Sequence, residues 1–486
     1  MTIQLDPVHL KDTIQGLVDD LYLPGIAVGV VQGPKLVFAE GFGYADIESQ
    51  RPQSPELRQR IGSITKTMVA LSTMALVEEG KLSLDDRVTD HLPEVDFEGE
   101  ARLLTIRHLL THTGGIGEAP RPADAVHMLD ALWGYQPEPR PVLGQYPEGI
   151  LLEVEPGTKW CYANHGFALL GEIVRKAEGG LTIDEVLSKR IFAPLGMCDT
   201  EIQDLPHPDL TTGYHHAPTP EEARLRIHTQ VDSDDETPID GRNIRGRHLY
   251  IKGRAAGSVQ STIPDMAKYA SALLAQSDGI VAPGSFESMV SPQWCPDRRL
   301  QHIGFSFFLH ERFGRRTFGH GGGVNGGWNT MLTLLPDEDL ALLVHLNLTS
   351  DLLARVEGTI LQTLLGASRD ELPVVLPEPD LLAAAPGVYE ATPGSLTNFR
   401  IIGNTGRVQI RAEDDQLMLH ARRGPWKDGV RMVPTDPEDP AFFTLDTDAL
   451  ERPAVALVRN ARGHVTGLRF DRLVAMMRSR EKPWLE

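Results

Sequence analysis

The stretch GSITKTMVALSTMALVEEG, residues 62–80, decides the fold of this chain. Its apolar residues recur at helical spacing from Ser63 to Glu79, and Gly80 follows where a glycine commonly ends a helix. The pattern therefore predicts a helix that begins at Ser63. Because Lys66 is three residues further on, its amine and the Ser63 hydroxyl are expected on the same face of the first turn.

A serine and a lysine placed in this way can form a nucleophile and its base. The N-terminus of a helix favours negative charge near Ser63 and discourages protonation of a neighbouring lysine. An uncharged Lys66 can then take the serine proton, which activates a hydroxyl that is otherwise a weak nucleophile. The spacing alone is weak support, since Ser479 and Lys482 repeat it in a charged C-terminal tail, where a surface segment is the better interpretation.

Further along the chain, Tyr162-Ala163-Asn164 is the single Y-x-N of the sequence. A tyrosine beside an ammonium loses its proton more readily, so Tyr162 is a candidate general base or proton relay. The Asn164 amide can hold Lys66 and orient a substrate carbonyl. The competing structural interpretation is a half-buried tyrosine followed by a loop asparagine.

A glycine-rich run, GHGGGVNGG, occupies residues 319–327. Glycines let the backbone approach a ligand closely, and an exposed N–H in such a run can form half of an oxyanion hole. His112-Thr113-Gly114 also reads H-x-G, but it precedes Tyr162 and ends a predicted helix. We therefore interpret it as a structural turn.

The apolar pattern around these motifs predicts an α+β fold. Strand-like runs occur at 25–31, 35–42, 304–310, 328–335 and 340–348. Helical spacing is found within 1–26, where Val8 to Leu21 carry it, and at 102–111, 165–176, 264–274 and 351–365. Strands at both ends of a helical middle indicate an antiparallel sheet flanked by helices, with a helical insert. The loops at 116–158 are expected to shape a pocket, and the polar segment 215–247, with its acidic run 232–236, an exposed insertion.

The last part of the chain has a different character. Four prolines, at 373, 377, 379 and 386, mark a linker. Short strand-like runs with turn signals follow at 399–402, 407–411, 416–420, 442–445 and 454–458. We predict a first domain at 1–370, a linker at 371–382 and a small antiparallel β-barrel at 383–486.

Taken together and in this order, the three motifs resemble those of the penicillin-recognising serine hydrolases, which include class C β-lactamases, D,D-peptidases, D-aminopeptidases and related esterases. Supporting phrases are LLTHTGGI (109–116), EPG (155–157), AGSV (256–259) and PDM (264–266). The resemblance covers roughly residues 10–366 and implies a β-lactamase/transpeptidase-like fold. It implies Ser63 as the nucleophile, Lys66 as its base partner, Tyr162 as a second base or proton relay, and Asn164 as the support of Lys66.

The third motif departs from the commonest form of this family. The resemblance places Gly322 and Gly323 in the substrate site, with the N–H groups of Ser63 and Gly323 as the oxyanion hole. His320 stands where the family often has a lysine, whose permanent charge binds a substrate carboxylate. Because histidine is neutral much of the time near pH 7, the departure favours an esterase, amidase or aminopeptidase over a β-lactamase. The histidine form also resembles archaeal peptidases of the family that carry a C-terminal lipocalin-like barrel.

Composition limits the other classes of function. A net charge of −20 disfavours nucleic acid as a partner, and no stretch reaches the roughly 20 apolar residues that span a bilayer. Three widely spaced cysteines suit neither a disulfide framework nor a C-x-x-C metal site, and Cys161 is expected to be a small buried residue. The N-terminal segment lacks the features of a secretion signal, so we expect a cytoplasmic protein.

We therefore expect a serine hydrolase that cleaves an ester, amide or short peptide through an acyl-enzyme on Ser63, without metal or organic cofactor. The absence of G-x-S-x-G counts against an α/β-hydrolase, and Leu109 replaces the glutamate that a zinc site at His108 and His112 needs. Three alternatives stay open: a β-lactamase or penicillin-binding protein, an acyltransferase with the same acyl-enzyme, and a non-catalytic binding protein. We expect the barrel to be an accessory module that shapes the active-site entrance or mediates oligomerisation, and homo-oligomerisation stays open.

Overall fold

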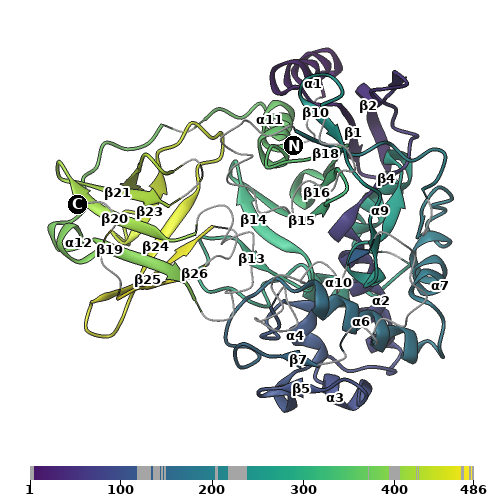
Figure 1. Cartoon of the computed structure of the whole chain (residues 1–486), viewed down its shortest axis with the longest axis horizontal. Helices are drawn as coiled ribbons and strands as arrows, with labels where there is room; N and C mark the ends of the chain where they lie inside the picture. The colour runs from purple at the N-terminus through teal and green to yellow at the C-terminus, as the bar shows by residue number, and fades with distance from the viewer. Residues whose placement is uncertain are drawn as a thin grey trace.

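The structure is a computed structural model of the whole chain, in which two bodies lie side by side (Figure 1). The residues described are 5–117, 133–134 (backbone only), 143, 146, 149–202, 206–216, 238–277, 279–369, 371–392, 406–422, 424, 426–471, 475–480 and 483. The acidic run 232–236, the strand-like run 399–402 and much of the loop region 116–158 lie outside them. We call the larger body, within 5–369, the sheet domain and the smaller one, within 387–478, the barrel.

An eight-stranded antiparallel sheet forms the frame of the sheet domain, in the order β13-β14-β15-β16-β17-β1-β2-β3. Its strands are β1 (Gly25–Gln32), β2 (Lys35–Asp46), β3 (Arg51–Pro52), β13 (His302–Ile303), β14 (Phe308–Arg312), β15 (Arg315–Val324), β16 (Trp328–Leu335) and β17 (Leu340–Leu346). β1 pairs with β17, with Val28 opposite Val344, so the two ends of the domain meet in the centre of the sheet. Both strands are apolar and buried almost throughout, because helices cover both faces.

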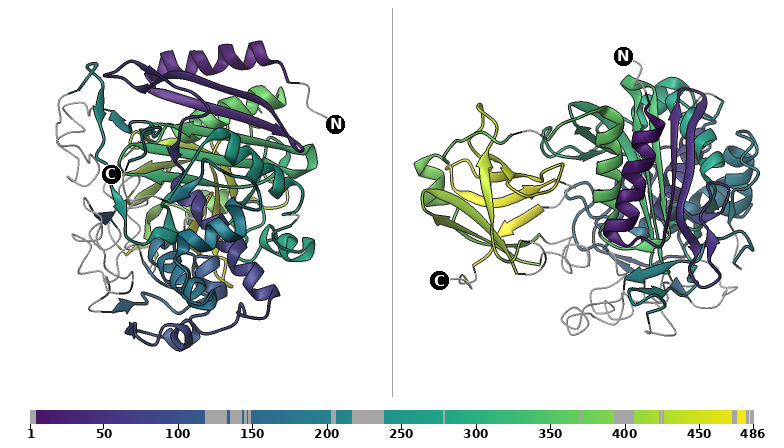
Figure 2. Two further views of the ribbon diagram at one scale, coloured as in Figure 1. Left: turned by 90° about the vertical axis from the view of Figure 1, so that its right-hand side faces the viewer. Right: turned by 90° about the horizontal axis from the view of Figure 1, so that it is seen from above.

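On one face of the sheet, α1 (Pro7–Leu21) and α11 (Leu353–Leu365) lie side by side (Figure 2). Leu10 and Ile14 of α1 join Ile360 of α11 in a single core with β1 and β17. Asp6 caps α1 by accepting from the amides of Val8 and His9, which places the apolar stripe against the sheet.

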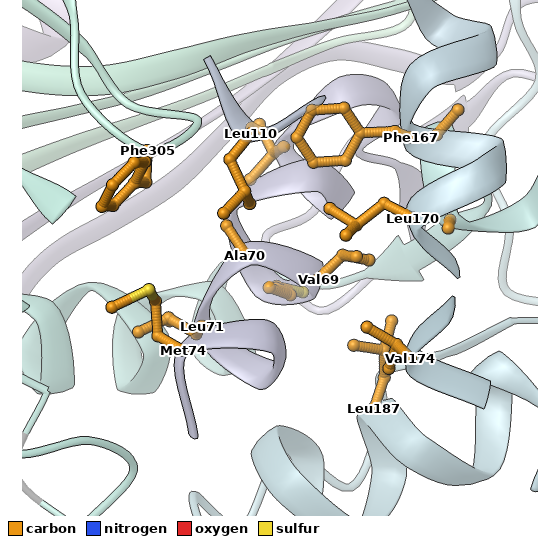
Figure 3. Packing of buried hydrophobic residues seen from close by; sticks show 14 of the residues in the cluster. Val69, Ala70, Leu71, Met74, Leu110, Phe167, Leu170, Val174, Leu187 and Phe305 are labelled. Carbon is orange, nitrogen blue, oxygen red and sulfur yellow. The ribbon is translucent and has the colours of Figure 1, made fainter. Parts of the chain in front are cut away.

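The other face carries the helices that contain Lys66 and Asn164. These helices are α2 (Thr65–Glu78), α3 (Val88–His91), α4 (Ile106–Leu110), α6 (Asn164–Ala177), α7 (Ile183–Leu187), α9 (Ile263–Leu274) and α10 (Pro283–Met289). Every residue of α2 from Thr65 to Leu76 is buried. Figure 3 shows Val69 and Ala70 surrounded by Leu110 of α4 and Phe167 of α6. A helix that is buried on all sides needs such a shell, which holds the start of α2 in a fixed place.

Short strands and single turns connect these layers. The small sheets pair β4 (Gln59–Arg60) and β8 (Glu201–Ile202) with β12 (Val259–Ser261), β5 (Phe97–Glu98) with β7 (Ile150–Leu151), β6 (Trp133–Gly134) with β11 (Tyr250–Ile251), and β10 (Asn243–Arg245) and β18 (Leu348–Thr349) with β9 (Tyr214–His216). Short helical turns are η1 (Gly62–Ile64), η2 (Ala101–Leu103), η5 (Ser188–Phe192), η6 (Arg254–Ala256) and η7 (Pro336–Glu338).

The C-terminal body is a closed eight-stranded barrel, as predicted. After α12 (Pro379–Ala384) its strands are β19 (Gly387–Ala391), β20 (Val408–Glu413), β21 (Gln416–Ala421), β22 (Val430–Pro434), β23 (Phe442–Leu445), β24 (Ala454–Arg459), β25 (Val465–Phe470) and β26 (Ala475–Arg478). β26 pairs with β19, with Arg478 opposite Tyr389, which closes the barrel and leaves no free edge. Apolar side chains, including Leu419, Met432 and Phe443, pack together in its core.

The predicted fold class is confirmed, with local differences. The helix predicted at 102–111 is divided into η2 and α4. The strand predicted at 304–310 begins only at Phe308, because Ser306 has a left-handed backbone with a φ of 68° that a strand does not accept. Val8, predicted on the apolar stripe of the first helix, is 69% exposed.

Candidate active site

Ser63 lies in the turn η1, at the entrance to α2, and only 7% of its surface is exposed. The turn is possible because Gly62 has a φ of +53°. A Cβ atom on Gly62 would lie 2.7 Å from the backbone nitrogen of Gly323, so only glycine lets the turn approach β15 this closely. The backbone of the candidate nucleophile thus lies directly against the glycine-rich strand.

Lys66 is fully buried one helical turn after Ser63. Its Nζ donates to Ser63 Oγ at 2.9 Å and to Asn164 Oδ1 at 2.8 Å. A third hydrogen bond runs to the backbone carbonyl of Ala256, in η6. The structure therefore brings together Ser63 of η1, Lys66 of α2 and Asn164 of α6, as expected from the sequence.

Tyr162 lies just before α6 and is buried beside Lys66, whose Nζ is 5.0 Å from the centroid of the tyrosine ring. His112 also stacks on Tyr162, with 4.2 Å between ring centroids. His112 Nδ1 also accepts a hydrogen bond from the Ala163 amide at 3.1 Å. His112 has a left-handed backbone with a φ of 56°, consistent with a turn, and its ring in addition orients the Y-x-N segment.

Gly322 and Gly323 lie in β15, directly against the turn that carries Ser63. A Cβ atom on Gly322 would lie 1.9 Å from the carbonyl oxygen of Ile61, so glycine is required there as well. Thr330 of β16 donates to the same carbonyl at 2.9 Å, which ties the turn to the sheet. These contacts place the backbone of Gly323 next to that of Ser63, where an oxyanion hole is expected.

His320 is 3% exposed and packs into an aromatic cluster. Its ring lies edge-on to Phe308 at 5.0 Å and 6.2 Å from the Tyr162 ring. His320 Nδ1 is within hydrogen-bond distance of the Gly321 carbonyl, which can only accept. Nδ1 is therefore the donor, and in the neutral ring Nε2 is the acceptor. Trp160, 6.2 Å from Phe308 and from Tyr162, extends the cluster.

A buried cation lies three residues before Ser63. Arg60 is 4% exposed, and burial lowers the pKa of its guanidinium to about 10. It donates to the Leu249 carbonyl and lies 5.6 Å from the Trp328 ring, with no carboxylate of the described residues paired to it. Burial and the charge of Arg60 lower the pKa of His248 to about 4. Arg60 thus places a buried positive charge three residues before the candidate nucleophile, against Leu249 and Trp328.

Within the described part of the chain, no group of three His, Cys, Asp or Glu side chains could hold a metal ion. His108 lies 3.1 Å from the Thr105 hydroxyl in a capping arrangement, and burial lowers its pKa. Cys161 is buried, as predicted. Sequence reasoning missed the ring of His112, the Ala256 carbonyl, Thr330 and Phe308. The H-x-G motif at His112 can be read in the sequence, but its partner ring, Tyr162, is 50 residues away, and only the fold brings the two rings together.

This fold and this site together define a serine hydrolase. The chain belongs to the beta-lactamase family. The family model described as Beta-lactamase matches residues 10–366. A penicillin-binding protein of Bacillus subtilis (strain 168) is 26% identical over 354 residues, which are 71% of this chain and 72% of the relative. A D-aminopeptidase of Brucella anthropi is 26% identical over 358 residues, 72% of this chain, and the match spans 61% of that relative.

A solved structure resembles the whole chain, barrel included. The octameric penicillin-binding protein homologue from Pyrococcus abyssi superposes with a TM-score of 0.62 at 22% identity, covering 97% of this chain and all of the other. This similarity shows that sheet domain and barrel together form a known fold. In the part of the chain that the structure describes, no helix is long and apolar enough to cross a membrane.

Proposed function

We propose that the chain hydrolyses an ester or amide bond through an acyl-enzyme on Ser63. The observation that carries the proposal is the hydrogen bond between Lys66 Nζ and Ser63 Oγ at the buried start of α2. In its uncharged form Lys66 accepts the serine proton, and Ser63 then attacks the carbonyl carbon. The other acceptors around Lys66, Asn164 Oδ1 and the Ala256 carbonyl, are uncharged oxygens that hold the amine toward Ser63.

The later steps use Tyr162 and the backbone. The N–H groups of Ser63 and Gly323 stabilise the oxyanion of the tetrahedral intermediate. Tyr162, beside Lys66, passes a proton to the leaving group, which departs as an alcohol or amine and leaves the acyl group on Ser63. A water molecule activated at the same site then attacks the acyl-enzyme and releases the acid.

The surroundings of His320 support an uncharged leaving group. Its ring is held by Phe308 and the Gly321 carbonyl, so this position offers no permanent cation to a substrate carboxylate. The substrate that fits best is a neutral ester, an amide, or a short peptide from which the N-terminal residue is cleaved. The name of the D-aminopeptidase relative agrees with the amide and peptide part of this range.

The test measures intact-protein mass after brief incubation with p-nitrophenyl butyrate, a penicillin and a D-alanine amide, in wild type and Ser63→Ala. We expect a butyryl adduct or steady product release that Ser63→Ala abolishes while its circular dichroism stays unchanged. The reactive compound ranks esterase, penicillin-binding protein and aminopeptidase, and added alcohol detects acyl transfer. Silence from all three with folded wild type contradicts the proposal and favours the non-catalytic alternative.

We also propose that the chain self-associates. The linker exposes Val374, Val375 and Leu376, at 101%, 49% and 58%, and three adjacent exposed apolar residues are unusual on a monomer. The octameric neighbour agrees with this expectation. Light scattering of wild type and of a variant with Val374→Ser and Leu376→Ser tests it: a monomeric wild type contradicts the proposal.

A further inference from the structure

The barrel contacts the sheet domain at the edge of the sheet, beside β13 and β14 (Figure 1). Leu300, just before β13, packs against Phe442 of the barrel. Arg299 forms ion pairs with Asp436 at 2.7 Å and Asp439 at 2.9 Å, both barrel residues. We call these ion pairs the Arg299 contact. It holds the barrel to the loop that precedes β13.

A second set of contacts reaches β14 itself. Arg312 Nε donates to Glu451 Oε1 of the barrel at 2.8 Å, and Arg312 Nη1 donates to Glu357 Oε1 of α11 at 2.6 Å. The Arg312 side chain is only 14% exposed. His310 Nε2 lies 3.4 Å from Asp471 Oδ1, also in the barrel. We call the Arg312–Glu451 pair and the His310–Asp471 pair together the β14 anchor.

The same strand begins with Phe308, which faces the candidate active site. Its ring lies 5.0 Å from that of His320 and 6.2 Å from that of Trp160. Four residues of strand, about 13 Å, separate Phe308 from Arg312. β14 pairs with β15 along this whole length, from Phe308 opposite Gly319 to Arg312 opposite Arg315, so one end cannot shift without straining the ladder.

We propose that the barrel positions the leaving-group side of the active site through β14. The β14 anchor holds the strand, and the strand holds Phe308 against His320. Phe308 and Trp160, both half-buried, then form a subsite for an uncharged apolar or aromatic leaving group. This inference rests on the proposed function, because it concerns the group that Ser63 displaces.

The charges of the β14 anchor explain why removing it should loosen β14. Two carboxylates share one largely buried guanidinium, and such hydrogen-bonded pairs are stronger than exposed ones. Removing the Glu451 charge leaves Arg312 paired only with Glu357, so the strand keeps its tie to α11 and loses its tie to the barrel. Asp436 offers a matched control, since it pairs with Arg299 in the same interface but not with β14.

The experiment compares methyl butyrate with benzyl butyrate, which share an acyl group and therefore give the same acyl-enzyme. We expect Glu451→Gln to lower the ratio of kcat/KM for benzyl over methyl about three- to tenfold, the worth of one aromatic contact. Asp471→Asn should act in the same direction, and Asp436→Asn should leave the ratio within about twofold. Hydrogen exchange should quicken at the amides of 308–312 in Glu451→Gln and not in Asp436→Asn.

A double-mutant cycle separates positioning from general damage. Phe308→Leu should lower the same ratio, and adding Glu451→Gln to it should cause little further loss if both act through one ring. Additive losses, an equal effect of Asp436→Asn, or unchanged exchange at 308–312 would overturn the inference. Reaction with p-nitrophenyl butyrate keeps the two hypotheses apart. A wild type that gives neither adduct nor Ser63-dependent product release contradicts the proposed function, whereas a Ser63-dependent reaction with an unchanged ratio contradicts only the role of the barrel.

Discussion

His112 stacks its ring on that of Tyr162, with 4.2 Å between centroids and 28° between the ring planes. The same imidazole accepts from the Ala163 amide through Nδ1. One residue thus orients both the ring and the backbone of the Y-x-N segment. If Tyr162 transfers protons, its geometry depends on His112.

Tyr162→Phe removes the hydroxyl and keeps the stack. We expect kcat to fall by about 10²- to 10⁴-fold, the usual contribution of a general acid or base. His112→Asn should lower kcat less and leave KM nearly unchanged, because asparagine accepts the left-handed backbone but cannot replace the ring. Steady-state kinetics of the two variants and of their combination check this. Near-normal turnover of Tyr162→Phe would remove Tyr162 from the mechanism.

Gly322 and Gly321 are adjacent and differ in what a methyl group would meet. On Gly322 it would lie 1.9 Å from the Ile61 carbonyl, whereas on Gly321 the nearest atom is the flexible end of Met331 at 3.3 Å. Gly322→Ala should push β15 away from the nucleophile's turn and cost about 10²- to 10³-fold in kcat, as loss of an oxyanion donor does. Gly321→Ala should stay close to wild type. Equal kcat and thermal midpoints for both variants would contradict this account of the turn.

His320→Lys introduces a permanent cation at this position. We expect tighter binding of substrates that carry a carboxylate, and the gain should shrink as salt is raised. His320→Met, of similar size but uncharged, should show no such gain. The check is KM for a matched pair of substrates with and without a carboxylate. Unchanged selectivity in His320→Lys would show that this side chain does not face the ligand.

Arg60→Gln removes the buried charge near Ser63 without removing the side chain. At an effective dielectric constant of about 20, a unit charge at about 10 to 20 Å contributes on the order of 1 kcal/mol, which is on the order of tenfold in rate. We expect kcat to fall by that order. Arg58→Gln is the control, since Arg58 is already paired with Glu201 and Asp199. A larger effect from Arg58→Gln would assign both arginines to stability rather than to the electrostatics of the site.

His345, in β17, predicts a loss of stability in acid. It is buried, neither of its ring nitrogens has a hydrogen-bond partner among the described residues, and burial lowers its pKa to about 3. Below pH 6.5 the His345 imidazole binds a proton in the unfolded chain, whereas in the folded chain it stays neutral until the pH falls to about 3. The free energy of unfolding therefore falls over this window by up to about 1.4 kcal/mol per pH unit. His345→Leu should flatten the pH dependence of the unfolding midpoint between pH 7 and 5. Substituting the exposed His464 should not, and equal slopes for all three proteins would refute the assignment.

Much of this protein follows from local sequence. Ser63 lies in η1 and Lys66 in the first turn of α2, which follows it directly, so their contact depends on local helical geometry and on the residues that bury α2. The alternating runs predict the sheet and the barrel for the same reason, because a strand exposes its two faces at a period of two. Confirmed boundaries, such as both ends of β23 and the C-terminal end of α9, lie where the pattern is strong and turn residues are clear.

What surrounds the serine and lysine was decided by the tertiary structure. Asn164 and Ala256 reach Lys66 from 98 and 190 residues away, and His112 meets Tyr162 across 50 residues of sequence. No sequence periodicity predicts contacts across such sequence separations, because these contacts depend on which helices share a core. Likewise the sequence by itself predicted an accessory barrel but not its contacts. Only the packing of the barrel against the edge of the sheet brought Glu451 to Arg312, because residues 139 apart meet only through the tertiary fold.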